Sequence, residues 1–95
     1  MIKTRITNAD LFGNIGEFKI TQYYGQDAID FANNHEREDI RNWILEYLHK
    51  DCITSNKEIG TVIGIEDNEE FDDYYLIIYV PEIKEVRFDL AAKLI

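Results

Sequence analysis

Two residues of the types used in nucleophilic or metal chemistry lie near one another in the sequence, His49 and Cys52. A cysteine thiolate is activated by a helix N-terminus, a neighbouring cation or a metal. Cys52 instead follows the C-terminal end of a helix expected over residues 36–51 and stands beside Asp51, so we expect a small buried hydrophobe. A structural zinc site needs four ligands, and no second pair accompanies these two residues. A small metal-binding protein or enzyme that uses His49 and Cys52 remains an alternative hypothesis.

The carboxylates are densest in residues 66–73, where six of eight residues are acidic. No Lys or Arg occurs between Glu58 and Ile83. The stretch lacks the glycine and the bidentate glutamate that an EF-hand loop requires at its sixth and twelfth positions. Acid–base catalysis needs a carboxyl group in an apolar pocket, whereas we expect these carboxylates on an exposed loop. The sequence therefore predicts a protein that is not an enzyme, with no catalytic residue, no metal site and no cofactor.

The acidic stretch and the tyrosines that follow it have the composition of a partner-binding surface, because tyrosine is enriched at interface hot spots. Duplex DNA presents one negative charge per about 1.7 Å, and the acidic stretch approaches that density. The predicted surface consists of Glu66, Asp67, Glu69, Glu70, Asp72, Asp73, Tyr74 and Tyr75. A second acidic patch joins it if it falls on the same side: Asp27, Asp30, Glu36, Glu38 and Asp39. The alternative interpretation is a solvated turn whose charge keeps two apolar strands from aggregating.

The composition limits the partners. The 95 residues form one domain, 1–95, with a net charge of −9. Such a charge repels nucleic acids and anionic membranes and favours a basic protein surface. A single cysteine excludes an internal disulfide, and no apolar run is long enough to span a bilayer. We therefore expect a cytoplasmic protein, in the bacterial or infected-host cytosol.

The elements that position these residues follow from the apolar periodicity. Residues 2–7 and 17–24 alternate as strands do and are expected to pair as a hairpin. A short helix is expected from Asp27, ending at Asn33-Asn34, where asparagine tolerates a left-handed conformation. The main helix is expected over residues 36–51. Its apolar positions fit the helical spacing throughout: Ile40, Trp43, Ile44, Tyr47 and Leu48.

The second half of the chain predicts three more strands. Residues 53–57 form a polar link to a strand that opens at Ile59, in which Gly60 and Gly64 weaken the strand or mark a bulge. A central strand is expected over residues 74–80, ended by Pro81, and a last strand over residues 85–90. Residues 90–95 either extend that strand or form one helical turn. The predicted fold is α+β, with an antiparallel sheet of about five strands in the order ββααβββ and one long and one short helix on one face.

In size, charge and the clustered acids of residues 66–73, the chain resembles the small acidic single-domain proteins that phages and mobile elements use against host defence. These include anti-CRISPR proteins and DNA mimics. The resemblance implies a stoichiometric, non-catalytic inhibitor that docks on the basic nucleic-acid-binding groove of a nuclease such as a CRISPR effector. It rests on no diagnostic residue, so no functional position follows from it.

A second hypothesis is a structural or assembly module that forms a homodimer. The apolar edge of the sheet, or the outward face of the helix that contains Trp43, would supply the contact surface.

Overall fold

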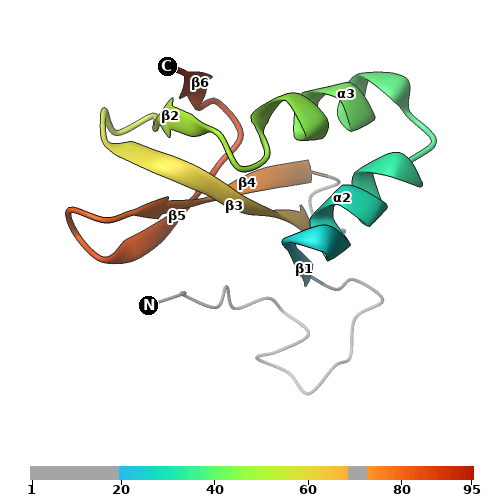
Figure 1. Cartoon of the computed structure of the whole chain (residues 1–95), viewed down its shortest axis with the longest axis horizontal. Helices are drawn as coiled ribbons and strands as arrows, with labels where there is room; N and C mark the ends of the chain where they lie inside the picture. The colour runs from blue at the N-terminus through green and yellow to red at the C-terminus, as the bar shows by residue number, and fades with distance from the viewer. Residues whose placement is uncertain (1–19, 69–72) are drawn as a thin grey trace.

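The computed structural model describes residues 20–68 and 73–95 and has an α+β architecture (Figure 1). The elements are β1 (Ile20–Tyr24), α2 (Gln26–Asn33), α3 (Glu38–Tyr47), β2 (Asp51–Ile53), β3 (Ile59–Asn68), β4 (Asp73–Val80), β5 (Glu85–Asp89) and β6 (Lys93–Leu94). All strand pairs are antiparallel, so the predicted fold class is confirmed, with six strands in the described part. The first predicted strand, residues 2–7, and its hairpin lie outside the described residues.

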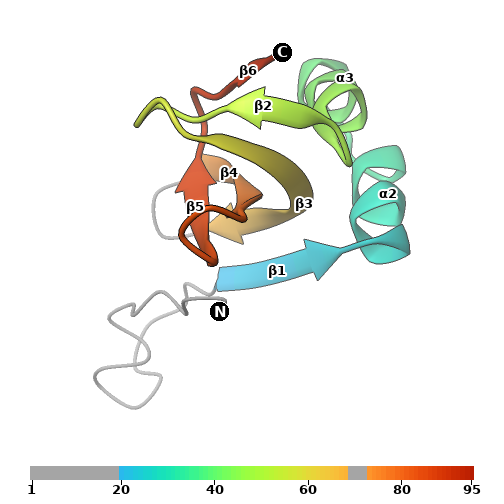
Figure 2. The same cartoon turned by 60° about the vertical axis from the view of Figure 1, so that its left-hand side comes forward.

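Strand β3 organises the sheet, whose order is β5-β4-β3-β2-β6. One edge of β3 pairs with β4. The other edge pairs with two strands in succession, first β2, with Ile53 opposite Ile59, and then β1, with Tyr24 opposite Gly64. Helices α2 and α3 connect β1 to β2 and lie together on one side of the sheet (Figure 2). The sheet therefore holds both ends of the helical segment.

Two glycines of β3 allow neighbouring strands to approach it closely. A Cβ at Gly64 would collide with the backbone oxygen of Tyr23, and a Cβ at Gly60 would lie 2.6 Å from the backbone oxygen of Tyr79. The register with β4 shifts between Val62 and Gly64. The shift lies next to Gly64, one of the two glycines predicted to weaken the strand or mark a bulge, and not at Gly60. At Gly64 only a residue without a side chain fits beside β1.

The main helix is shorter than predicted at both ends, and at ten residues it is only slightly longer than the eight-residue α2. Leu48 adopts an extended conformation and His49 a positive φ of 65°. The His49 N–H donates to the Val62 oxygen at 2.8 Å, and Val62 N–H donates to the Lys50 oxygen at 3.0 Å. Pairing with β3 therefore replaces the last helical turn that the periodicity predicted.

The termini of α2 also differ from the prediction. Gly25, with a φ of 55°, occupies the N-cap position in place of Asp27, which lies in the first turn. Asn34 ends the helix at a φ of −94°, so the left-handed conformation expected at Asn33-Asn34 is absent at this cap.

The main core lies between the helices and the sheet. Ala28, Ala32, Ile44 and Leu48 from the helical segment pack with strand residues that include Val62, Ile65, Leu76, Ile78 and Val80. Cys52 belongs to the same core and is fully buried, which confirms its prediction as a small hydrophobe, although it lies in β2 and not at a helix end.

Residues 90–95 adopt neither predicted conformation. They return along β2 as the short strand β6, with Leu94 opposite Cys52. The Asp89 carboxylate fixes this turn, because it accepts hydrogen bonds from the Ser55 N–H, the Ser55 hydroxyl and the Ala91 N–H. Neither of the helices in the described residues is long and apolar enough to cross a membrane.

Candidate functional site

Half of the acidic stretch belongs to the sheet. Glu66, Asp67 and Asn68 end β3 and Asp73 begins β4, so these four residues do not lie in the loop predicted for them. Glu69, Glu70 and Asp72 lie outside the described residues.

Glu66 is fully buried, so its predicted place on an exposed loop is wrong. Its carboxylate accepts a hydrogen bond of 3.1 Å from the Gln22 amide, whose oxygen accepts one of 2.8 Å from the Tyr24 hydroxyl. Burial, and secondly the negative charge of Glu66, raise the pKa of Tyr24. The face that carries Glu66 is opposite the helices, since Ile65 beside it packs in the helical core.

The two predicted tyrosines separate to opposite faces of β4. The Tyr75 hydroxyl donates to the Asp73 carboxylate at 3.3 Å. Tyr74 turns to the helical face, where its hydroxyl lies 2.8 Å from Nε2 of His35. Only Tyr74 of this pair reaches the site described below.

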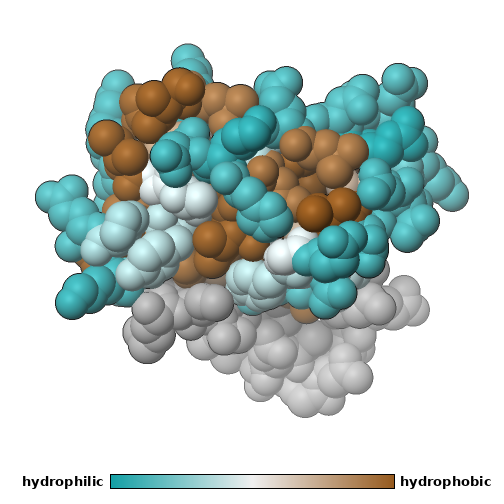
Figure 3. All heavy atoms as spheres, in the orientation of Figure 1, coloured by the Kyte–Doolittle hydropathy of each residue, from teal (hydrophilic) through white to brown (hydrophobic). Residues whose placement is uncertain are grey.

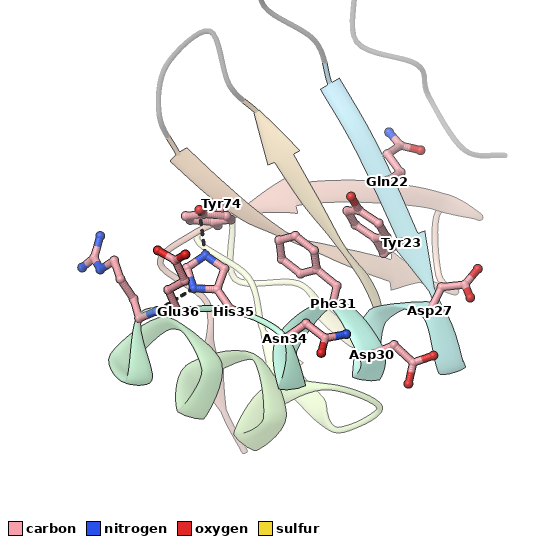
Figure 4. A pocket seen from close by; sticks show the side chains of 10 residues that line it. Gln22, Tyr23, Asp27, Asp30, Phe31, Asn34, His35, Glu36 and Tyr74 are labelled. Atoms are coloured by element: carbon pink, nitrogen blue, oxygen red, sulfur yellow. Dashed lines mark hydrogen bonds between the residues drawn. The ribbon is translucent and has the colours of Figure 1, made fainter.

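The described surface has a groove of about 830 Å³ between β1, α2, the α2–α3 connection and the start of β4 (Figure 4). Its lining combines aromatic, acidic and amide side chains: Gln22, Tyr23, Asp27, Asp30, Phe31, Asn34, His35, Glu36, Arg37 and Tyr74. We call it the acidic–aromatic groove.

Four rings form the floor of the groove. Tyr23 and Phe31 stack with their centroids 4.4 Å apart and their planes 21° from parallel. Phe31 also contacts His35 and Tyr74, at centroid distances of 5.7 and 6.1 Å. Each ring is therefore fixed by at least one other, and the floor is formed before any ligand arrives.

His35 connects the helical segment to the sheet. Its Nδ1 accepts a hydrogen bond of 3.0 Å from the backbone N–H of Arg37. That bond requires Nδ1 to be unprotonated, so in the neutral ring Nε2 bears the hydrogen and donates to the Tyr74 hydroxyl. The His35 ring also meets the Tyr74 ring edge-on at 5.2 Å.

Carboxylates stand at the two ends of this floor. Asp27 and Asp30 project from α2 at one end, and Glu36 lies at the other, beyond Asn34 (Figure 4). All three are exposed, and within the described part of the chain no lysine or arginine pairs with them. Asp30 accepts a hydrogen bond of 3.0 Å from the Gln26 amide.

Three of the described acids elsewhere pair with an arginine. Arg37 pairs with Asp39 at 2.7 Å, and its hydrogen bond lowers the pKa of Asp39. At the far end of the sheet, Arg87 donates two hydrogen bonds of 2.9 Å to Glu58, and these lower the pKa of Glu58. Arg87 also lies 3.6 Å from Glu85. In the described part of the chain, Asp27, Asp30 and Glu36 at the groove lack the arginine partners that Asp39, Glu58 and Glu85 have.

Comparisons of the chain with protein-family models, with curated proteins and with solved structures found no significant match. The assignment of a function therefore rests on the chemistry of the groove.

His49 and Cys52 do not form a site together. Cys52 is buried, whereas His49 is exposed at the turn into β2. Burial, with the carboxylates of Asp89 and Asp51, raises the pKa of the Cys52 thiol. Within residues 20–68 and 73–95, no three His, Cys, Asp or Glu side chains are placed to hold a metal ion.

The groove takes part of its lining from the second acidic patch. Asp27, Asp30 and Glu36 join Tyr74 at the groove, while Glu38 and Asp39 of the same patch do not line it. Sequence reasoning missed the floor. The four rings come from β1, α2, the α2–α3 connection and β4, so no local spacing in the sequence brings them together.

Proposed function

We propose that this protein is a non-catalytic acidic binding protein whose acidic–aromatic groove engages a basic segment of another protein. The observation that supports it best is the combination, in one groove, of four packed rings with three carboxylates that pair with no lysine or arginine of residues 20–68 and 73–95. Aromatic faces attract lysine and arginine cations, and the attraction grows as water is excluded. Carboxylates at the rim add charge pairing and orientation.

The net charge of −9 supports a protein partner and not a nucleic acid. A field of this sign repels phosphates and accelerates encounter with basic surfaces. We further propose that the partner is a basic surface that otherwise binds nucleic acid, as in a host defence nuclease or CRISPR effector, and that the protein acts in the cytoplasm as a stoichiometric inhibitor in the manner of a DNA mimic.

The general proposal is tested by binding to an immobilised arginine-rich peptide at about 50 and about 300 mM salt. We expect binding at the lower salt that weakens by about tenfold or more at the higher salt. Absence of binding at low salt, or binding indifferent to salt, contradicts the proposal.

The inhibitor proposal is tested by competition. Purified CRISPR effector nucleases are incubated with labelled target duplex and with increasing amounts of this protein. Release of the duplex at near-equimolar protein is expected, and simultaneous binding of both to the nuclease is contrary to mimicry.

A second candidate function, self-assembly, is favoured by a different surface. Ile53 and Ile59 form a cross-strand pair with 41% and 62% of their surfaces exposed, and Ile95 is 72% exposed. Apolar atoms gather where β2 and β6 lie in the view of Figure 3. Sedimentation of the wild type and an Ile59→Lys variant tests it, with a wild-type monomer at high concentration as the contrary result.

A further inference from the structure

We propose that the acidic–aromatic groove recognises an extended peptide with two arginines four positions apart and an apolar residue midway between them. This inference rests on the proposed function and specifies the ligand of the same groove.

The position of the carboxylates sets the spacing of the two arginines. Asp27 lies at the start of α2 and Glu36 lies beyond its end at Asn33. A helix rises about 1.5 Å per residue, so the two ends of the groove are separated by about 10 Å or slightly more. An extended chain advances about 3.3 Å per residue, so residues i and i+4 are about 13 Å apart and point to the same face. Adjacent residues point to opposite faces, and both cannot enter the groove together.

The aromatic floor determines the residue between the arginines. In an extended peptide, residue i+2 shares the face of i and i+4. It would lie over the rings of Phe31 and Tyr23, which Figure 4 shows between Glu36 at one end and Asp27 with Asp30 at the other. An apolar side chain fits this position because it removes ring surface from water without leaving a buried charge unpaired.

Arginine suits the ends better than lysine. Its planar guanidinium stacks on rings and bonds a carboxylate through two N–H groups at once, whereas the lysine ammonium is a compact, strongly hydrated charge. Asp27 and Asp30 lie three residues apart on one helix and present two carboxylates to one guanidinium.

The groove is also preorganised for this ligand. His35 is held by the Arg37 N–H and by Tyr74, and Phe31 contacts three other rings. Binding energy is therefore not consumed in ordering the floor.

Two synthetic isomers test the inference, Gly-Arg-Gly-Leu-Gly-Arg-Gly and Gly-Gly-Arg-Arg-Leu-Gly-Gly. Their equal charge separates spacing from bulk attraction. Affinity is measured by NMR titration of the full chain, with the amides of residues 23–36 reporting the location. We expect the spaced isomer to bind about tenfold more tightly than the adjacent one.

The matched variants are D27N/E36Q at the groove and E46Q/E82Q outside it, which change the net charge equally. The groove variant should abolish the preference for the spaced isomer, and the control should retain it. Circular dichroism melts establish that both variants fold.

Equal affinity for the two isomers, or an undiminished preference in D27N/E36Q, overturns the inference. If both isomers still bind with strong salt dependence, the proposed function survives. If neither isomer binds even at low salt, both the inference and the proposed function fail.

Discussion

The substitution Gly64→Ala tests how the sheet positions the groove. The added methyl group would collide with the backbone oxygen of Tyr23 and lie 3.0 Å from a ring carbon of Tyr24. Overpacking of this kind costs about 1–3 kcal/mol, and the reduced freedom of the unfolded chain offsets about 0.4–1 kcal/mol. We expect a net loss of about 1–2 kcal/mol in the free energy of unfolding, which lowers Tm by about 4–16 °C in a domain of this size.

The variant should also alter the groove, because β1 must move away from β3 and Tyr23 is part of the floor. Urea unfolding measures the stability, and amide chemical shifts of residues 23–36 measure the groove. Gly60→Ala is the matched control, since its Cβ meets Ile78 and Tyr79 at 2.6 Å, at β4 and away from the groove. It should lower stability but leave the groove shifts unchanged. Wild-type stability in Gly64→Ala, or equal groove shifts in the two variants, refutes the reasoning.

Three further predictions concern single side chains. Tyr74→Phe removes the acceptor of the His35 Nε2–H and should lower the free energy of unfolding, measured in urea, by about 1 kcal/mol. Nitrogen NMR of the wild-type protein should show the hydrogen of the neutral His35 ring on Nε2, and a hydrogen on Nδ1 would contradict the assigned hydrogen bonds. Arg87 holds the pKa of folded Glu58 below its ordinary value of 4.5, so near this pH the folded state binds fewer protons than the unfolded state. The stability that the Glu58–Arg87 pair contributes is therefore present above pH 4.5 and is lost as the pH falls through the folded pKa. Thermal melts of Glu58→Gln at a series of pH values should show a smaller loss of Tm on acidification than those of the wild type. Cys52 is buried with a raised pKa, so a thiol reagent should label it slowly in the native protein and rapidly in denaturant, and fast native labelling would contradict its burial.

The local patterns predicted the elements well. The helical spacing of Ile40, Trp43 and Ile44 located α3, and the alternation around Val86 located β5, because both signals arise within a few residues of the chain. Gly64 likewise indicated the irregularity of β3, next to which the register with β4 shifts.

The errors occur where distant segments compete with local preference. The periodicity extended α3 through Leu48, but the bonds of His49 and Lys50 to Val62 end the helix early. Leu94 lies in a strand because it pairs with Cys52, which is far away in the sequence. Glu66 is the first residue of the acidic stretch, yet pairing of β3 on both edges places it inside the sheet.

The site was predictable only in part. The sequence placed Asp27, Asp30 and Glu36 in a second acidic patch that would join the first only if both lay on the same side, and it predicted Tyr74 as a binding residue. Their meeting depends on β1 and β4 lying on either side of β3, which no short pattern specifies. The alternation of side chains along a strand was enough to predict that Tyr74 and Tyr75 point to opposite faces. It could not predict which of the two faces would meet the helices.

The attachment of β1 and β2 in tandem to one edge of β3 has a consequence for how this molecule could change over evolution or by engineering. The helical segment between β1 and β2 is held at both ends by β3, and lengthening a connection whose ends are fixed costs little chain entropy. Its inward positions, Ala28, Ala32, Ile44 and Leu48, must remain apolar to cover the sheet. The exposed positions of residues 25–50 are not part of this cover, so we expect substitutions there to change the ligand preference of the groove while the sheet is retained.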